Sequence, residues 1–310
     1  MDSRIENPAA VITKSASQQS YYTVRFLADR DRVDDAYRAY GYFRWVDDIL
    51  DSDSDTTPDQ RLGFLARQKD LLERCYRGEP PREAGPEERM LVEMVRHDRE
   101  AASGLQAYLR NMMRVMEFDA GRRGTLISHA ELNEYTHWLA VAVTEALHYF
   151  IGHDKYAPRG ETRYLAVSAA HIAHMLRDTY DDVRAGYFNI PREVLEAHRI
   201  SPADIDSAGY RAWTMSRVRL ARSYFRSARA QIRQVESLRC RLAGFAYTAR
   251  FEWMLDTIER EGYILRPSYD ERKGLGAGVK MIRRALSNLI GWRGENPSAS
   301  PAASHQRGNA

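Results

Sequence analysis

Two clusters of aspartates in this 310-residue chain have the same internal spacing and could hold a cation between them. They are Arg44-Trp-Val-Asp47-Asp48-Ile-Leu-Asp51 and, about 130 residues later, Arg177-Asp178-Thr-Tyr-Asp181-Asp182. Residues four apart on a helix point the same way, so Asp47 and Asp51 form one pair of like charges, and Asp178 and Asp182 form another. Such pairs repel unless a cation separates them. One cluster alone is typical of a solvated helix face, whereas two clusters that follow apolar helical segments favour facing carboxylate walls that hold Mg²⁺ against a diphosphate.

The overall composition is that of an ordinary globular protein, with 44% apolar and 29% charged residues. The net charge is only +3, and no block of like charge resembles a nucleic-acid-binding arm. Cys75 and Cys240 form neither a disulfide framework nor a zinc motif, which favours a reducing compartment. No segment resembles a signal peptide or a membrane span. We therefore expect a soluble, cytoplasmic protein with no nucleic-acid partner.

Nearly all of the chain has helical periodicity, without a convincing strand pattern or repeat. Helices are expected at about 20–28, 31–50, 59–77, 87–98, 101–118, 130–151, 161–183, 205–236, 239–261 and 275–291, with an extended flap at 187–191. The last helix is amphipathic and basic, so it either packs on the bundle or makes peripheral contact with a membrane. The prediction is all-α: one helical bundle of residues 14–293 around a central cavity, a flexible arm at 1–13 and a disordered tail at 294–310.

The acidic motifs resemble those of the squalene/phytoene synthase family, all-α prenyltransferases that join prenyl diphosphates. The resemblance covers about residues 14–275, and its best-matched parts are Tyr40-x-x-x-Arg44-x-x-Asp47-Asp48-Ile-Leu-Asp51 and Met175-Leu-Arg177-Asp178-x-x-Asp181-Asp182-x-Arg184-x-Gly186-x-Phe188-x-Ile190-Pro191. It implies an isoprenoid-synthase-type bundle with Mg²⁺ between the two motifs. The metal would grip an allylic diphosphate, whose C–O bond then breaks to give a cation. Mg²⁺ prefers hard oxygen ligands, so carboxylates and phosphate suit it.

The resemblance also implies roles for individual residues. Metal ligands are expected among the six motif aspartates, Asp47, Asp48, Asp51, Asp178, Asp181 and Asp182. Contacts with the diphosphate are expected from Ser20, Arg44, Arg177, Tyr263 and Arg266. The rings of Tyr40 and Tyr135 could stabilise the allylic cation, although either residue could equally be a packed core tyrosine.

The sequence departs from the family pattern just before the second acidic motif. His171 and His174 stand where the family usually has Gln and Asn, on the same helical face as Asp178. Imidazole is a poor Mg²⁺ ligand, so we expect one metal to be lost or moved. The histidines could be hydrogen-bonded pocket residues, a base or orienting pair for an acceptor that loses a proton, or part of a zinc site. Val141 and Thr144 replace glycines common in the family, which would narrow the cavity.

These departures predict that the donor site is kept and that the acceptor has changed. The main hypothesis is Mg²⁺-dependent transfer of a short prenyl group, such as dimethylallyl, to an aromatic carbon. This hypothesis rests on a resemblance to phytoene-synthase-like enzymes that prenylate carbazole-type natural products. In this reaction His171 or His174 would take the proton released from the aromatic carbon. The alternatives are head-to-head condensation of two prenyl diphosphates, a prenyl diphosphate cyclase or lyase, and a non-catalytic isoprenoid-binding or partner-binding protein. Unused clustered carboxylates would destabilise the fold, which argues against the last.

Overall fold

A computed structural model of the chain describes residues 7–51 and 57–273, together with 283, 285, 287 and 288. This part of the chain is built from helices and contains no strand, which confirms the all-α prediction. Its α-helices are α1 (Pro8–Ala16), α2 (Gln18–Leu27), α3 (Val33–Asp51), α4 (Pro58–Tyr76), α5 (Pro86–His97), α6 (Gly104–Arg122), α7 (His129–Phe150), α8 (Leu165–Ala185), α9 (Arg192–His198), α10 (Ala208–Arg233) and α11 (Leu238–Arg260). Two 3-10 helices, η1 and η2, span Glu161–Tyr164 and Asp270–Lys273.

Local sequence signals explain where many of these helices begin and end. Thr57 and Ser128 cap α4 and α7 with reciprocal capping boxes, which satisfy backbone amides that have no partner inside the helix. Proline occupies the first turn of α4 and of α5, where its missing amide hydrogen is not needed. Helix α8 ends at Gly186, whose left-handed φ of 88° suits a residue without a Cβ.

The flexible arm was expected at 1–13, and the described residues from Pro8 onward form α1. The Asn7 side chain accepts a hydrogen bond from the Ala9 amide, and Pro8 occupies the first turn. Ala9 and Thr13 are buried. A Cβ added at Gly41 on α3 would make ordinary contact with the Ala9 Cβ, at 3.6 Å, and a tighter contact with the Met90 sulfur, at 3.2 Å.

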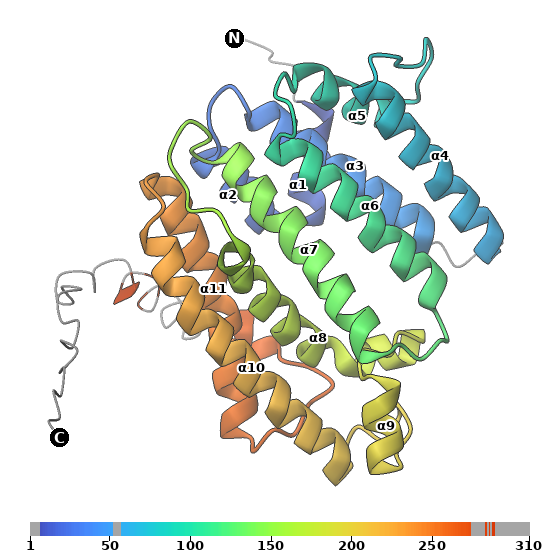
Figure 1. Cartoon of the computed structure of the whole chain (residues 1–310), viewed down its shortest axis with the longest axis vertical. Helices are drawn as coiled ribbons and strands as arrows, with labels where there is room; N and C mark the ends of the chain where they lie inside the picture. Colours follow the sequence, from blue (N-terminus) through green and yellow to red (C-terminus); the bar gives the residue numbers. More distant parts are fainter. Residues whose placement is uncertain (1–6, 52–56, 274–282, 284, 286, 289–310) are drawn as a thin grey trace, which may run out of the picture.

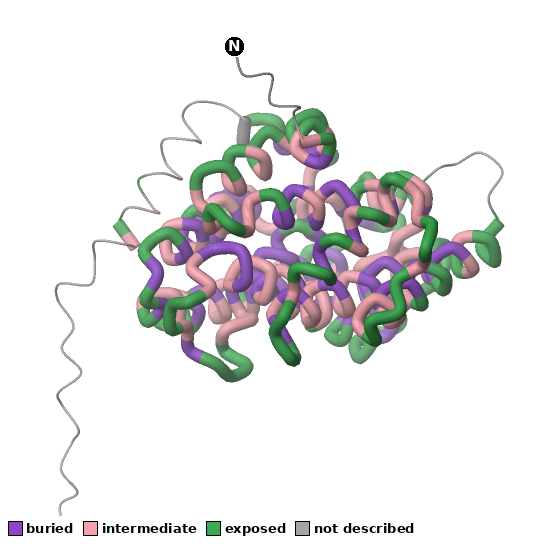
Figure 2. The backbone as a smooth tube through the Cα atoms, turned by 90° about the horizontal axis from the view of Figure 1, so that it is seen from above, coloured by how far each residue is buried: buried purple, intermediate pink, exposed green. Residues whose placement is uncertain are grey.

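The helices form one bundle with two neighbouring hydrophobic cores (Figure 1). The first core contains residues of α3, α4, α5 and α6, and the second contains residues of α8, α10 and α11. Helix α7 lies between α6 and α8 and contributes Tyr149 to the first core and Leu132 to the second. In Figure 2 the buried segments run through the middle of the molecule and the exposed ones lie around it. A site between α3 and α8 therefore lies where the two cores meet.

Helices α8 and α10 run antiparallel. The Tyr180 hydroxyl, near the end of α8, donates to Asp206, just before α10, at 2.9 Å. At the other end, Thr162 in η1 donates to Gln231, near the end of α10, at 3.1 Å. Residues early in α8 therefore lie opposite residues late in α10, and residues late in α8 lie opposite residues early in α10.

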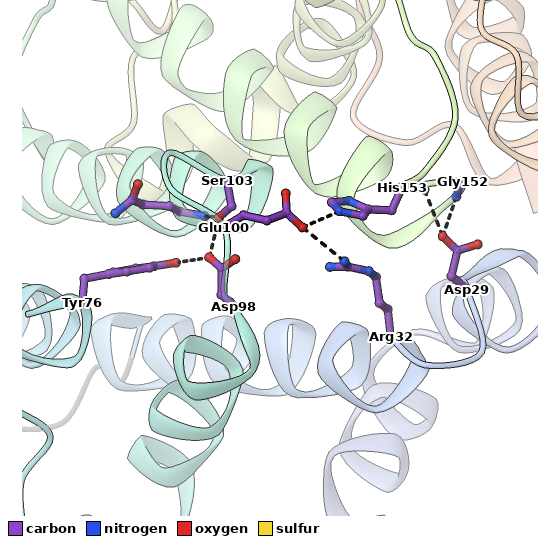
Figure 3. A network of polar contacts seen from close by, with 9 residues as sticks. Asp29, Arg32, Tyr76, Asp98, Glu100, Ser103, Gly152 and His153 are labelled. Atoms are coloured by element: carbon purple, nitrogen blue, oxygen red, sulfur yellow. Dashed lines mark hydrogen bonds and ion pairs between the residues drawn. The ribbon is translucent and has the colours of Figure 1, made fainter. Parts of the chain in front are cut away.

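A polar network joins three loops at one end of the bundle (Figure 3). Asp29 accepts hydrogen bonds from the amides of Gly152 and His153, at 2.8 and 3.0 Å. Glu100 pairs with His153 and, at 3.5 Å, with Arg32. These contacts fix the loops that precede α3, α6 and η1.

Arg239 connects the last long helix to the same end of the bundle. Its guanidinium donates to the carbonyl oxygens of Leu27 and Ala28, both at 3.1 Å, and pairs with Asp29. The start of α11 is therefore attached to the turn between α2 and α3.

No helix in the described part of the chain is long and apolar enough to cross a membrane. The helix expected at 275–291 is described at four positions only, and the expected tail at 294–310 lies outside the described residues.

Candidate active site

The two acidic motifs line one cavity of about 200 Å³ between α3 and α8. Helix α3 contributes Asp47 and Asp51, and α8 contributes Asp178 and Asp182, so each wall presents carboxylates one helical turn apart. The other lining residues are Asp119, Arg122, Tyr135, His171, His174, Met175, Tyr187 and Asn189. The fold thus brings together two clusters that are far apart in the sequence.

The remaining two motif aspartates lie outside the lining of this cavity. The side chain of Asp48 is 54% exposed and pairs with Arg44, and that of Asp181 is 70% exposed and pairs with Arg184 at 3.0 Å. Each is the sequence neighbour of a lining aspartate, and consecutive residues on a helix point about 100° apart. The cavity therefore uses the i, i+4 pairs and not all six carboxylates.

The lining carries much more negative than positive charge, with five carboxylates and one arginine, Arg122. Burial, with the charge of Asp51, raises the pKa of Asp47 to about 6. Burial and the charge of Asp178 raise the pKa of Asp182 to about 7. Both shifts show that ionised carboxylates are disfavoured here, so a bound cation would relieve the repulsion.

Asp178 differs from the other lining carboxylates because two basic side chains hold it. His174 Nε2 lies 2.8 Å from Oδ2, and Arg177 donates to both carboxylate oxygens. Burial acts to raise the pKa of Asp178, but the hydrogen bonds from His174 and Arg177 outweigh it and hold this pKa well below its usual value. The protein itself thus compensates the charge of this aspartate.

Three residues of the site, Asp119, Arg122 and Asn189, were not assigned roles from the sequence. Arg122, only 7% exposed, donates to Asp119 at 2.8 Å and to the Asn189 side-chain oxygen at 3.0 Å. Asn189 in turn donates to Asp182 at 2.8 Å. This series of hydrogen bonds connects α6 to the α8 wall through the segment after α8. The expected helix at 101–118 stopped just before Asp119, so the inward-facing positions of its last turn were overlooked.

Tyr135 is packed against Phe118 and Arg122, which also contact each other. Phe118 stacks on it with ring centroids 5.0 Å apart, and the Arg122 guanidinium lies 5.0 Å from its centroid. The Tyr135 hydroxyl donates to Asp119 at 2.8 Å. These contacts favour the packed-tyrosine interpretation, in which Tyr135 holds Asp119 and Arg122 in place, over a direct contact between its ring and a cationic intermediate.

His171 lines the cavity and is 6% exposed. Its ring stands edge-on to Tyr135, with centroids 5.1 Å apart. Neither ring nitrogen has a hydrogen-bond partner among the described residues. Burial and the nearby charges of His174, Arg122 and Arg217 lower the pKa of His171 to about 3, so the imidazole is neutral.

None of the five residues expected to contact a diphosphate lines the cavity. The Ser20 hydroxyl accepts a hydrogen bond from the Ser17 hydroxyl. Arg266 forms ion pairs with Glu261, at 2.9 Å, and with Glu271. Arg44 binds the outer Asp48, while Arg177 reaches the site through Asp178. Tyr40 and Tyr263 are also absent from the lining. Their roles remain predictions.

Another, smaller cavity of about 50 Å³ has a different set of lining residues. Thr144 lines it together with His148, Cys240 and Tyr247. The Thr144 hydroxyl has no hydrogen-bond partner among the described residues. Thr144 thus lines a cavity that shares no lining residue with the acidic cavity.

The described residues do not hold three His, Cys, Asp or Glu side chains in an arrangement that could bind a metal ion unaided. The zinc site considered for His171, His174 and Asp178 would need such a cluster, so the geometry offers it no support.

The sequence of this chain matches a known protein family. Residues 13–273 match the model of the squalene/phytoene synthase family. The chain belongs to this family. Its members are prenyltransferases, so the chain is a transferase of this type. The family resemblance inferred from the two acidic motifs is confirmed.

The sequence is also similar to presqualene diphosphate synthase from Rhodopseudomonas palustris (strain ATCC BAA-98 / CGA009), with 27% identity over 188 residues. The match covers 60% of this chain and 62% of that enzyme, which is less than two thirds of its length.

Two solved structures share the fold. Squalene synthase HpnC from Alicyclobacillus acidocaldarius superposes with a TM-score of 0.65 at 20% identity, over 83% of this chain and 94% of that one. A dehydrosqualene synthase in complex with ligand gives 0.70 at 16% identity, over 92% and 96%. These neighbours confirm the isoprenoid-synthase-type bundle of this family member.

Proposed function

We propose that this protein is a Mg²⁺-dependent prenyltransferase that ionises an allylic prenyl diphosphate between α3 and α8. The observation that carries the proposal is the single cavity lined by Asp47 and Asp51 on one helix and by Asp178 and Asp182 on the other. The raised pKa values of Asp47 and Asp182 support it, because they mark a site that lacks positive charge.

The carboxylates best placed to hold the metal are Asp47, Asp51 and Asp182. Asp178 is already compensated by Arg177 and His174, so a metal would have to displace a hydrogen bond to reach it. Bound Mg²⁺ would neutralise the diphosphate as the C–O bond breaks and the electron pair leaves with the diphosphate. On the α8 wall, Asn189 orients Asp182 and is itself held by Arg122.

The first candidate for the acceptor is a second prenyl diphosphate. The family match and the similarity to presqualene diphosphate synthase support this choice. In such a reaction the allylic cation adds to the double bond of the second substrate, forms a carbon–carbon bond and then loses a proton.

An aromatic acceptor is the second candidate, and a specific feature of the cavity supports it. The inner wall is polar, with the neutral His171 facing the cavity and no partner on either nitrogen among the described residues. The volume of about 200 Å³ lies below the roughly 300–1,000 Å³ of pockets for drug-sized ligands and suits a short donor better than two long chains. The aromatic carbon would attack the cation and then lose its ring proton.

One incubation series tests the proposal and separates the two acceptors. Purified protein with Mg²⁺ is given dimethylallyl, geranyl or farnesyl diphosphate, each alone and each with hydroxylated aromatics, and products are identified by mass spectrometry. A dimeric hydrocarbon or cyclopropyl diphosphate from one substrate supports the first candidate, and a prenylated aromatic supports the second. If no substrate gives Mg²⁺-dependent diphosphate release, the proposal is wrong.

A further inference from the structure

The interface of α8 and α10 contains two buried side chains without a hydrogen-bond partner among the described residues, and beside them a largely buried arginine that forms no ion pair there. His171 on α8 has two unpaired ring nitrogens, and Thr214 on α10 has an unpaired hydroxyl. Arg217 on α10 is 7% exposed and contacts the Trp213 ring at 5.0 Å, but pairs with no carboxylate in the described part of the chain. Buried polar groups in native proteins are usually hydrogen-bonded, so this cluster needs an explanation.

The antiparallel arrangement of the two helices puts these groups close together. The side chain of Tyr210 interacts with that of Thr179, which fixes one level of the interface. Arg217 lies two turns after Tyr210 on α10, and His171 lies two turns before Thr179 on α8. Because the helices are antiparallel, these two residues lie at about the same level of the interface. The charge of Arg217 lowers the pKa of His171, as expected for neighbours. His171 lines the cavity, and Arg217 is not among the lining residues.

The chemistry of this pair points to an oxygen atom as its partner. A neutral imidazole offers one N–H donor and one acceptor, and the guanidinium offers only donors. Burying a cation without a partner costs free energy, so a ligand that pairs with the cation would stabilise such a site. A bare hydrocarbon chain would leave every one of these groups unsatisfied.

We propose that His171 and Arg217 form a subsite for an oxygen atom of the acceptor substrate. His171 contacts the oxygen from the cavity wall, Arg217 supplies positive charge behind it, and Thr214 is a further donor at the same interface. The proposal rests on the prenyl transfer proposed above and adds where the acceptor binds. Two sources share this chemistry: a diphosphate oxygen of a second prenyl diphosphate and the hydroxyl of an aromatic acceptor.

Equilibrium binding tests the subsite without requiring turnover. The protein is first saturated with Mg²⁺ and inorganic diphosphate at the donor site, and then titrated calorimetrically with more diphosphate, with 1-naphthol or with naphthalene. Wild-type protein is expected to bind either a second diphosphate or 1-naphthol, the latter roughly 10-fold more tightly than naphthalene. The first result assigns the oxygen to a diphosphate and the second to a hydroxyl.

Arg217→Met and His171→Phe should both remove this selectivity. Because Arg217 is not among the lining residues of the cavity, Arg217→Met should leave the first Mg²⁺–diphosphate binding event unchanged. Arg217→Met should also raise the melting temperature of the ligand-free protein by about 2–4 °C, because an unpaired buried charge is replaced by an apolar chain. If Arg217 only stabilised the fold, Arg217→Met would instead lower the melting temperature.

Arg222→Met is the matched control on the same helix, since Arg222 pairs with Asp256 and Glu259. It should lower the melting temperature and leave acceptor binding intact. If both site variants bind the two probes as wild type does, His171 and Arg217 hold only water and the subsite is refuted. If even wild type fails to bind Mg²⁺ and the first diphosphate, the prenyltransferase proposal fails instead.

Discussion

His174 and Asp178, one turn apart on α8, are joined by a 2.8 Å contact between Nε2 and Oδ2. Because Arg177 also donates to both oxygens of this carboxylate, Asp178 already has basic partners before any metal arrives. The two acidic walls, which have the same spacing in the sequence, are therefore unequal in the folded protein. Their different affinity for cations can be measured.

Replacing His174 should make the α8 wall a better cation ligand. In His174→Ala, one oxygen of Asp178 loses its hydrogen-bond donor, so Mg²⁺ affinity in the presence of inorganic diphosphate should rise several-fold. Isothermal titration calorimetry measures this directly. His198→Ala, at an exposed position on α9, is the control and should bind Mg²⁺ as wild type does. Weaker Mg²⁺ binding in His174→Ala would contradict the expected competition.

Inner and outer aspartates should differ sharply in their effect on activity. Asp47→Asn and Asp182→Asn remove carboxylates that line the cavity, and diphosphate release should fall by at least about 100-fold, since charge neutralisation by a metal contributes several kcal/mol. Asp48→Asn and Asp181→Asn change exposed neighbours and should alter the rate by less than about 3-fold. The same assay covers all four variants. Equal losses for Asp47→Asn and Asp48→Asn, or for Asp182→Asn and Asp181→Asn, would refute the assignment of the lining residues.

His148 should make the fold sensitive to acid. Burial lowers its pKa to about 4, whereas an unfolded histidine titrates near 6.5. Between these values the unfolded state binds the extra proton, so this contribution to stability is complete above about pH 6.5 and is lost as the pH falls towards 4. By pH 5 the loss is roughly 2 kcal/mol.

Urea unfolding of His148→Leu at pH 7 and pH 5 measures this contribution. The variant should lose less unfolding free energy on acidification than wild type does, while His198→Leu should behave like wild type. An unchanged pH dependence in His148→Leu would show that this histidine is accessible to protons in the native state.

Gly186 should be needed for the segment that carries Asn189. Its φ of 88° is unfavourable for a residue with a Cβ, and its carbonyl accepts a 2.8 Å hydrogen bond from the Gly124 amide. Gly186→Ala should destabilise the protein by about 1 kcal/mol and raise KM for the donor, since Asn189 holds Asp182. Gly63→Ala, in an open position inside α4, should instead stabilise it by about 0.5–1 kcal/mol. Chemical denaturation and steady-state kinetics check both outcomes.

The sequence predicted those parts of the site that depend on local geometry. The spacing of Asp47 with Asp51 and of Asp178 with Asp182 is enough to place each pair on one helix face, and the cavity between them was anticipated correctly. Most helix boundaries were predictable for the same reason, because caps and prolines act within one turn. The aromatic acceptor proposed from the departures stays a proposal.

Features that depend on contacts between distant segments were not predictable. Arg122 meets Asn189 across 67 residues, and no spacing rule links them. Arg217 is one of many arginines along α10, and only the packing of that helix on α8 shows it to be buried. Ser20 and Arg266 matched a family pattern, but the structure places their side chains outside the cavity lining.

The contacts of Arg239 affect how the protein can be made in a cell. The bonds from α11 to the carbonyls of Leu27 and Ala28 join segments more than 200 residues apart. A ribosome releases the first helices long before the partner that anchors them, so the N-terminal end must wait for most of the chain to be synthesised. Closing so long a loop is entropically slow, which makes completion of this end a late step in folding.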